Sequence, residues 1–167
     1  DKIKLDRLIE LLKQSNDIDK LGLIYEKLIE KKTGNLEYLK NHINILIMQK
    51  NYGKVINSIK LLVNEAPAEI DFAIERLDMI FNYCDDKLTV YKTYIELYGT
   101  VGKSAMMKEY YQKMIEEFSD TPLIQEKIAL ATIYRETGRE SEAVRIYENI
   151  TGFEPENIDV LKQLGNL

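Results

Sequence analysis

The sequence has little cysteine, proline or glycine, and it has no long hydrophobic run. Cys84 is the only cysteine in 167 residues, so neither an internal disulfide nor a cage of cysteine thiolates around a metal ion is available. A single cysteine fits a reducing compartment, and we expect a cytoplasmic location. The most apolar stretch, residues 43–48, is far shorter than the ~18 residues of a membrane span, so no such span is expected. Three prolines and eight glycines suit a mostly helical chain with short turns.

The remaining composition is that of a folded protein. Hydrophobic residues make up 45% of the chain and charged residues 31%, and 167 residues are enough to bury a core. The net charge is −5 and no basic block is present, which gives little support for binding to nucleic acid phosphates.

The first part of the chain repeats itself after 34 residues. Leu5 then falls on Leu39 and Leu21 on Val55, so large apolar residues recur. Within a unit they form two stripes with helical spacing, separated by the polar residues 14–17. The stripes consist of Leu5, Leu8, Ile9 and Leu12, and of Leu21, Ile24, Tyr25 and Leu28. Each unit is therefore predicted to be a helix, a tight turn and a second helix.

The later part of the chain also repeats. At a shift of 36 residues, Tyr98, Gly102 and Tyr111 fall on residues of the same type, namely Tyr134, Gly138 and Tyr147. The two additional residues are assigned to a loop at 122–123, where an insertion is tolerated.

Residues 124–157 resemble a tetratricopeptide repeat, whose pattern is W-x2-L-G-x2-Y, then A-x3-F, then P. The matching positions hold Lys127, Leu130, Ala131, Tyr134, Ala143, Tyr147 and Pro155, with Gly138 in the turn. Lys127 replaces the tryptophan of the pattern and Ala131 its glycine. The resemblance implies an all-α fold, a right-handed α-solenoid of antiparallel helix pairs that stack as a superhelix.

The repeat pattern predicts one domain of this type over residues 1–167. Its units are repeats at about 2–35 and 36–69, an extra helix at 70–86, repeats at 88–121 and 124–157, and a partial repeat at 158–167. The segment 70–86 has two interpretations, a lone extra helix or one degenerate helix pair. Because the sequence starts without a methionine and stops inside a repeat, we expect it to be a piece of a longer protein.

In the tetratricopeptide family, the first helices of successive pairs line a concave groove that holds a partner peptide or helix. The resemblance therefore implies a set of partner-binding residues in this chain. They are Glu37, Lys40, Asn44, Ile47, Lys92, Glu96, Thr132, Arg135 and Lys162, with Thr89, Gln125, Ile128 and Asp159 at further positions of the same face. This mixture of charged, polar and apolar residues suits an extended peptide or a helix.

Some family members hold the C-terminal carboxylate of a chaperone with a clamp of five Lys, Asn and Arg side chains. Lys40 and Asn44 match the first two positions of this clamp. The other three positions do not match and hold Thr93 or Glu75, Gln125 and Ala129. Polar helix faces give two such matches by chance, so we expect no working clamp.

Several residues could suggest chemistry, and each has a simpler structural interpretation. His42, the only histidine, occupies a core position and has no second ligand for a metal. Asp86 follows Asp85 directly before an apolar helix pattern, which favours helix capping. Cys84 lacks a nearby histidine that would activate it. Residues 99–104 end in Gly-Lys-Ser but lack the spacing and the preceding strand of a phosphate-binding loop, and we interpret them as a turn. No catalytic residue, metal or cofactor is expected.

The sequence thus predicts a noncatalytic protein–protein interaction scaffold that supports assembly of a multiprotein complex. RNA binding by a helical-repeat groove is an alternative, as in half-a-TPR or pentatricopeptide proteins, although the acidic charge balance argues against it. Self-assembly through an apolar end face of the repeat array is another, and would make a homo-oligomer. A regulatory domain attached to an enzyme elsewhere in a longer chain is a further alternative.

Overall fold

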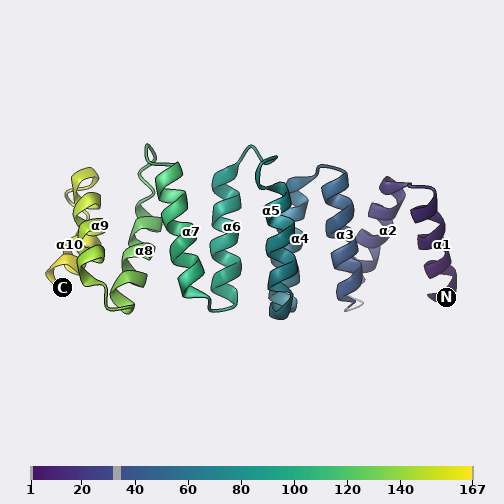
Figure 1. The fold of residues 1–167 in the computed structure, drawn as a ribbon, viewed down its shortest axis with the longest axis horizontal. Helices are drawn as coiled ribbons and strands as arrows, with labels where there is room; N and C mark the ends of the chain where they lie inside the picture. Colours follow the sequence, from purple (N-terminus) through teal and green to yellow (C-terminus); the bar gives the residue numbers. More distant parts are fainter. Residues whose placement is uncertain (1, 32–34, 167) are drawn as a thin grey trace. The chain divides into compact units, whose positions relative to one another are not determined.

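A computed structural model describes residues 2–31 and 35–166 of the chain (Figure 1). This part of the protein contains ten α-helices, one short 3-10 helix (η1) and no β-strand. The elements are α1 (Lys2–Gln14), α2 (Ile18–Glu30), α3 (Leu36–Met48), α4 (Tyr52–Glu65), η1 (Pro67–Glu69), α5 (Ile70–Phe81), α6 (Lys87–Thr100), α7 (Ser104–Glu117), α8 (Ile124–Glu136), α9 (Glu140–Phe153) and α10 (Ile158–Gly165). The predicted all-α class is confirmed. No helix in residues 2–31 and 35–166 combines the length and apolarity that crossing a membrane requires.

The chain forms two compact units, Asp1–Thr93 and Tyr94–Leu167, and the boundary falls within α6. Inside each unit, helices that follow one another in the chain run in opposite directions (Figure 1). The helix bounds fall inside the predicted repeats, but residues 32–34, at the end of the first repeat, and residue 167 lie outside the described part. The division into repeats stays a prediction.

Four turns between paired helices have the same backbone geometry. Asn16, Lys50, Gly102 and Gly138 all have positive φ, between 54° and 73°, and each lies two residues before the next helix. In every case the following N–H donates a hydrogen bond to the carbonyl five residues back, as in Asn51 N to Leu46 O at 2.9 Å and Arg139 N to Tyr134 O at 2.8 Å. This is the Schellman arrangement, which ends one helix sharply and starts the next. Residues 99–104 are therefore a turn of this kind, as the sequence predicted.

Unit 1 buries its apolar residues between neighbouring helices. Leu21 and Tyr25 of α2 pack with Ile9 of α1 and Ile45 of α3, and Leu5 and Leu12 lie at the margin of the cluster. Leu8 was predicted to lie on the apolar stripe of α1, but 45% of its surface is exposed. The described helices pack against the Ile9 side of α1 and leave Leu8 uncovered.

The segment predicted as an extra helix at 70–86 begins as expected at Ile70 but ends at Phe81. Residues 82–86 instead form the loop to α6, because Asp86 caps that helix: its Oδ1 accepts from Thr89 N at 3.0 Å. The capping role predicted for Asp86 is confirmed. Helix α5 packs against α4 and also contacts α3, so it lies beside the first helix of the preceding pair.

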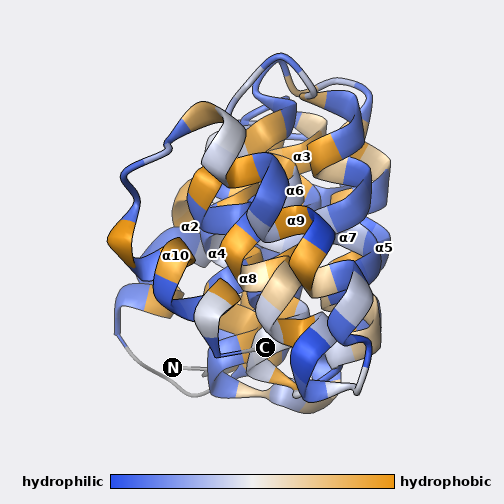
Figure 2. Ribbon diagram, turned by 90° about the vertical axis from the view of Figure 1, so that its left-hand side faces the viewer, coloured by the Kyte–Doolittle hydropathy of each residue, from blue (hydrophilic) through white to orange (hydrophobic). Residues whose placement is uncertain are grey.

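Unit 2 has its core between α8 and α9. Ala131 and Ala143 are completely buried, and their small side chains let the two helices approach closely around Tyr147 and Ile150. Val160 of α10 extends this core. Near the start of the unit, Tyr94 of α6 stacks on Tyr110 of α7 with ring centroids 4.3 Å apart. Figure 2 shows hydrophobic and hydrophilic residues alternating along the individual helices, as this mode of packing requires.

Candidate functional site

The predicted partner-binding residues of unit 1 lie on α3, and two of them are linked to neighbouring side chains. Lys40 Nζ lies 3.0 Å from Glu37 Oε1 on the same helix and 3.0 Å from Glu69 Oε1 of η1. Hydrogen bonds with Glu37 and Glu69 raise the pKa of Lys40 above its ordinary value. Lys40 therefore bridges two carboxylates and joins α3 to the start of α5.

A second link runs from Asn44 to α5. Arg76 Nε donates a hydrogen bond to Asn44 Oδ1 at 2.7 Å, and the guanidinium carbon lies 4.3 Å from the centre of the Phe72 ring. Lys40 Nζ lies 5.7 Å from the same ring centre. Arg76 Nη1 lies 2.8 Å from Glu75 Oε2 and forms an ion pair with this carboxylate.

Together these side chains form what we call the α3–α5 cluster, which consists of Glu37, Lys40, Asn44, Glu69, Phe72, Glu75 and Arg76. Two cations and three carboxylates surround one aromatic ring, and the ring face attracts both cations. Glu37 and Glu75 remain 68% exposed, whereas the side chain of Arg76 is 18% exposed. Arg76 is thus held by Asn44 and Phe72, whereas the carboxylates of Glu37 and Glu75 are exposed to solvent.

The cluster bears directly on the chaperone-type clamp considered from the sequence. Lys40 and Asn44, the two residues that match the clamp, are already engaged by Glu69 and Arg76. A carboxylate ligand would have to displace Glu69 from Lys40. Ile47, further along α3, is half-buried and does not belong to the cluster.

The predicted residues of unit 2 on α8 and α10 show a similar link between helices. Arg135 Nη1 of α8 donates a hydrogen bond to Gln163 Oε1 of α10, which follows the exposed Lys162 in the sequence. The hydroxyl of Thr132 instead donates to the carbonyl of Ile128, one turn back on its own helix, at 2.9 Å. Arg135 is therefore linked to α10 at the residue next to Lys162, and Thr132 takes no part in this link.

The two predicted residues on α6 are both exposed and lie one turn apart. Lys92 belongs to unit 1 and Glu96 to unit 2. The Lys92 ammonium acts on Asp86, whose pKa is lowered mainly by its hydrogen bonds from Thr89 and further by this positive charge.

Sequence reasoning missed Glu69, Phe72, Arg76 and Gln163, which complete the two links. A signal for one of them is present, because Arg76 follows Asn44 by 32 residues, which is close to the 34-residue period. A polar residue about one period from a groove position is therefore the residue to examine. Gln163 follows Arg135 by only 28 residues and gives no such signal. Arg76 was not predicted to be a site residue because segment 70–86 was interpreted as an extra helix outside the repeats.

The residues weighed for chemistry have structural roles. His42 is 7% exposed, its Nδ1 is buried without a hydrogen-bond partner, and burial lowers its pKa. Burial raises the pKa of the half-buried Cys84 thiol, with Asp85 and Asp86 adding to this effect, so the thiol form is favoured. Across residues 2–31 and 35–166, no group of three or more His, Cys, Asp or Glu side chains could hold a metal ion.

Comparisons with known proteins found neither a matching family model nor a matching curated protein. Solved structures of tetratricopeptide repeat proteins do match. The thermophilic TPR protein TTC0263 of Thermus thermophilus is 17% identical, with 96% of this chain and 95% of that chain covered and a TM-score of 0.39. MamA of Desulfovibrio magneticus RS-1 is 11% identical over 94% and 97% of the two chains, with a TM-score of 0.43. A tetratricopeptide repeat protein of Parabacteroides merdae ATCC 43184 is 15% identical over 87% and 62%, with a TM-score of 0.37.

These proteins have the architecture that the sequence resembles. In this chain, four turns with positive φ join consecutive helices into pairs.

Proposed function

We propose that this chain is a noncatalytic scaffold that holds a peptide or helix of a partner protein against the first helices of its pairs and so supports a multiprotein complex. We further propose that, within each unit, the pairs stack as a right-handed superhelix, whose concave side this face lines. One observation carries the proposal. In each unit, one residue that is predicted to face the partner forms a hydrogen bond with a side chain of another helix. Asn44 accepts from Arg76 in unit 1, and Arg135 donates to Gln163 in unit 2.

Such bonds favour binding because they fix side chains before the partner arrives. A long charged side chain that is already held loses less conformational freedom on binding than a free one. The negatively charged side chains of Glu37 and Glu75 are exposed to solvent, and the positively charged side chains of Lys40 and Arg76 that pair with them are more buried. This alternation suits a peptide that offers both donors and acceptors. We place this activity in the cytoplasm, on the ground that a single cysteine fits a reducing compartment.

The test is a pull-down from lysate of the source organism with the wild-type chain and a groove variant as baits. The groove variant carries Lys40→Glu, Lys92→Glu and Arg135→Glu. We expect a protein partner to be retained by the wild type and lost, by at least about tenfold, with the variant, as the removal of charged interface contacts predicts. Equal retention by both baits contradicts the proposed face. Recovery of nucleic acid in place of protein would support the RNA-binding alternative.

A matched control separates the face from a general effect of charge. Lys20, Lys54 and Lys113 lie on second helices, and each forms an ion pair with a carboxylate, as Lys40 does. A triple variant to glutamate at these positions changes the net charge by the same amount and breaks a comparable number of ion pairs. It is expected to retain the partner. Melting curves of all three baits show whether any loss of binding follows from unfolding.

One observation favours self-assembly as a second candidate function. Helix α1 exposes 80% of Ile3, 45% of Leu8 and 53% of Leu11, so its exposed side carries three large apolar side chains among charged residues. If two copies pair through this side, the size of the protein in solution rises with concentration, and Leu8→Glu with Leu11→Glu abolishes the rise. A size that stays monomeric at all concentrations rejects this candidate.

A further inference from the structure

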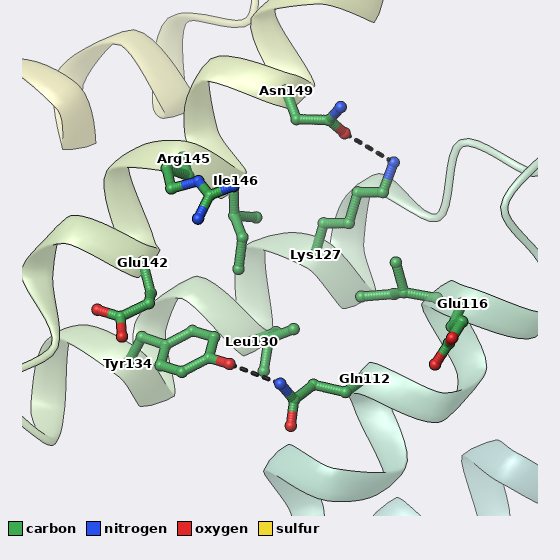
Figure 3. A pocket seen from close by; sticks show the side chains of 10 residues that line it. Gln112, Glu116, Lys127, Leu130, Tyr134, Glu142, Arg145, Ile146 and Asn149 are labelled. Carbon is green, nitrogen blue, oxygen red and sulfur yellow. Dashed lines mark hydrogen bonds between the residues drawn. The ribbon is translucent and has the colours of Figure 1, made fainter.

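Unit 2 contains a cleft of about 400 Å³ between α7, α8 and α9 (Figure 3). Apolar side chains from all three helices line it, namely Ile115, Leu130 and Ile146. Lys127, Arg145 and Asn149 contribute polar groups. The volume lies within the range of ~300–1,000 Å³ that is typical of ligand-binding clefts.

This cleft is separate from the proposed partner-binding face. On α8, Lys127, Leu130 and Tyr134 line the cleft. Thr132 and Arg135, which belong to the proposed face, point to another side, because a helix turns about 100° with each residue. A ligand in the cleft would therefore leave the proposed face of unit 2 free.

The sequence explains why space is present here. Lys127 stands where the tetratricopeptide pattern has tryptophan, a large residue that fills the gap between helices. The lysine stem is narrower and its end is charged. Lys127 is nevertheless only 8% exposed, with Nζ 3.1 Å from Asn149 Oδ1 and 4.9 Å from the centre of the Phe153 ring.

A buried ammonium normally has a carboxylate partner or a full set of acceptors. Lys127 has three N–H donors, and Asn149 is the one hydrogen-bond acceptor found for them within the described part of the chain. Arg145, exposed at the edge of the same cleft, likewise forms no ion pair with any described residue. Two cations therefore line the cleft without an ion-pair partner among the described residues.

The carboxylates at the cleft do not fill this role. Glu142 accepts from Arg139 Nε at 2.8 Å and from Ser141 Oγ at 2.8 Å, and these bonds, the one from Arg139 first, lower its pKa. Glu116 lies across the cleft from Arg145 in Figure 3. Within the described residues, neither Glu142 nor Glu116 forms an ion pair with Lys127 or Arg145.

From this arrangement we propose that the cleft binds an acidic peptide segment, taking one large aliphatic side chain between Ile115, Leu130 and Ile146 and an adjacent carboxylate at Lys127 and Arg145. The aliphatic group removes apolar surface of the three helices from water. The carboxylate supplies acceptors to the buried ammonium and pairs with the guanidinium. The peptide is thus recognised by an apolar residue next to a negative charge.

The test uses two small probes that differ only in the charge. N-acetyl-leucine has the aliphatic side chain and a carboxylate, and N-acetylleucinamide has the same side chain and no charge. Binding is followed by the backbone amide NMR shifts of Leu130, Ile146 and Asn149. A probe of this size is expected to bind with a Kd of about 1–10 mM, and the uncharged amide at least about fivefold more weakly.

Three variants show where the probe binds. Lys127→Met keeps the length of the side chain and removes its charge, so the preference for the acid over the amide is expected to shrink to the part that Arg145 supplies. Arg145→Gln, at an exposed position that leaves the core unchanged, is expected to weaken the acid about two- to fivefold, as for one exposed ion pair. Lys127→Trp fills the cleft and is expected to abolish the shifts caused by both probes.

Several outcomes would overturn the proposal. They are equal binding of acid and amide by the wild type, saturating shifts that persist in Lys127→Trp, and no saturating shift with either probe. Acetate that reproduces the shifts at the same concentration would mean that the cleft takes small anions and not a peptide side chain.

The groove variant with Lys40→Glu, Lys92→Glu and Arg135→Glu separates this inference from the proposed function. It is expected to bind N-acetyl-leucine like the wild type, because none of the three residues lines the cleft. If Lys127→Met reduces the preference for the acid but the groove variant still retains the partner, the cleft inference stands and the proposed face fails. If Lys127→Met keeps the full preference for the acid but the groove variant loses the partner, only the cleft inference is rejected.

Discussion

Arg76 and Asn44 join α5 to α3 through a hydrogen bond of 2.7 Å from Nε to Oδ1, although 32 residues separate them in the sequence. The bond holds the guanidinium against Phe72, 4.3 Å from the ring centre. It also places Arg76 beside Lys40, so that both cations share one ring. The face proposed to bind a partner is therefore a structure built by two helices and not a row of independent surface residues.

Loss of this bond is expected to destabilise unit 1. Asn44→Ala leaves the partly buried Arg76 Nε without its acceptor, which costs about 1–3 kcal/mol for a charged donor. The measurement is the urea midpoint of unfolding, compared with that of the wild type. Asn57→Ala, at an exposed position of α4, is the matched control and is expected to change stability by less than about 0.5 kcal/mol. Equal midpoints for the two variants would show that the bond contributes nothing.

Overpacking is expected at the point where α8 and α9 meet. Ala143 is completely buried against the core of unit 2, so Ala143→Leu forces the helices apart at a cost of about 1–3 kcal/mol. Thermal melting measures the effect. Ala105→Leu adds the same atoms at an exposed position of α7 and is expected to leave the melting temperature nearly unchanged. A normal melting curve for Ala143→Leu would mean that the two helices do not pack as described.

The shared turn geometry predicts opposite effects for two glycine substitutions. Gly138 has φ of 73°, so Gly138→Ala strains the turn by about 1–2 kcal/mol even though its side has open space. Gly152 lies inside α9 with open space and no positive φ, so Gly152→Ala is expected to stabilise by about 0.5–1 kcal/mol. Chemical denaturation of both variants provides the comparison. If both substitutions raise, or both lower, the free energy of unfolding, the proposed strain at Gly138 is contradicted.

The reverse substitution tests the same geometry in unit 1. Lys50 has φ of 56° without being a glycine, so it holds a conformation that L residues disfavour. Lys50→Gly relieves this strain and is expected to stabilise by up to about 1 kcal/mol, since the added freedom of the unfolded chain offsets part of the gain. A loss of stability would contradict the expectation.

His42 makes the stability of unit 1 depend on pH. Burial lowers its pKa below the ordinary 6.5, while the Glu26 carboxylate opposes this shift and the Lys54 ammonium adds to it. The unfolded chain therefore binds a proton at a higher pH than the folded chain does. The stabilisation is complete above about pH 6.5 and is lost as the pH falls through this value toward the lower folded pKa.

His42→Leu is expected to remove this dependence, since leucine packs in the same core without a titrating group or an unsatisfied Nδ1. Free energies of unfolding measured from about pH 8 to about pH 5 give the slope for each protein. The wild type is expected to lose stability over this interval by more than the variant does. Parallel curves would show that His42 titrates alike in the folded and unfolded chains.

The parts of the fold that local patterns encode were predictable from the sequence. The apolar stripes around Leu21 and Leu130 have helical spacing, and Gly102 and Gly138 mark turns because only glycine adopts positive φ without strain. Asp86 indicated a helix start because its side chain can accept from the backbone of the first turn.

The parts that depend on contacts between distant residues were not predictable in the same way. Nothing local to Arg76 states that it bonds to Asn44, because this link requires α5 to lie beside α3. For Leu8, a contact was predicted that is not formed. Its spacing fits the apolar stripe of α1, but no described helix covers it. The cleft beside Lys127 is present because lysine fills less space than the tryptophan of the repeat pattern. The sequence shows this difference only as a mismatch at one position.

Site-specific photocrosslinking tests the central claim most directly. A benzoylphenylalanine residue is introduced singly at exposed positions of first helices, Glu37 and Lys162, and at exposed positions of second helices, Asn57 and Ala105. Irradiation in lysate is followed by identification of the attached molecules. The proposed function predicts that the same protein becomes attached at positions 37 and 162 and not at positions 57 and 105. Attachment mainly at positions 57 and 105, or attachment of nucleic acid at any position in place of protein, would contradict it.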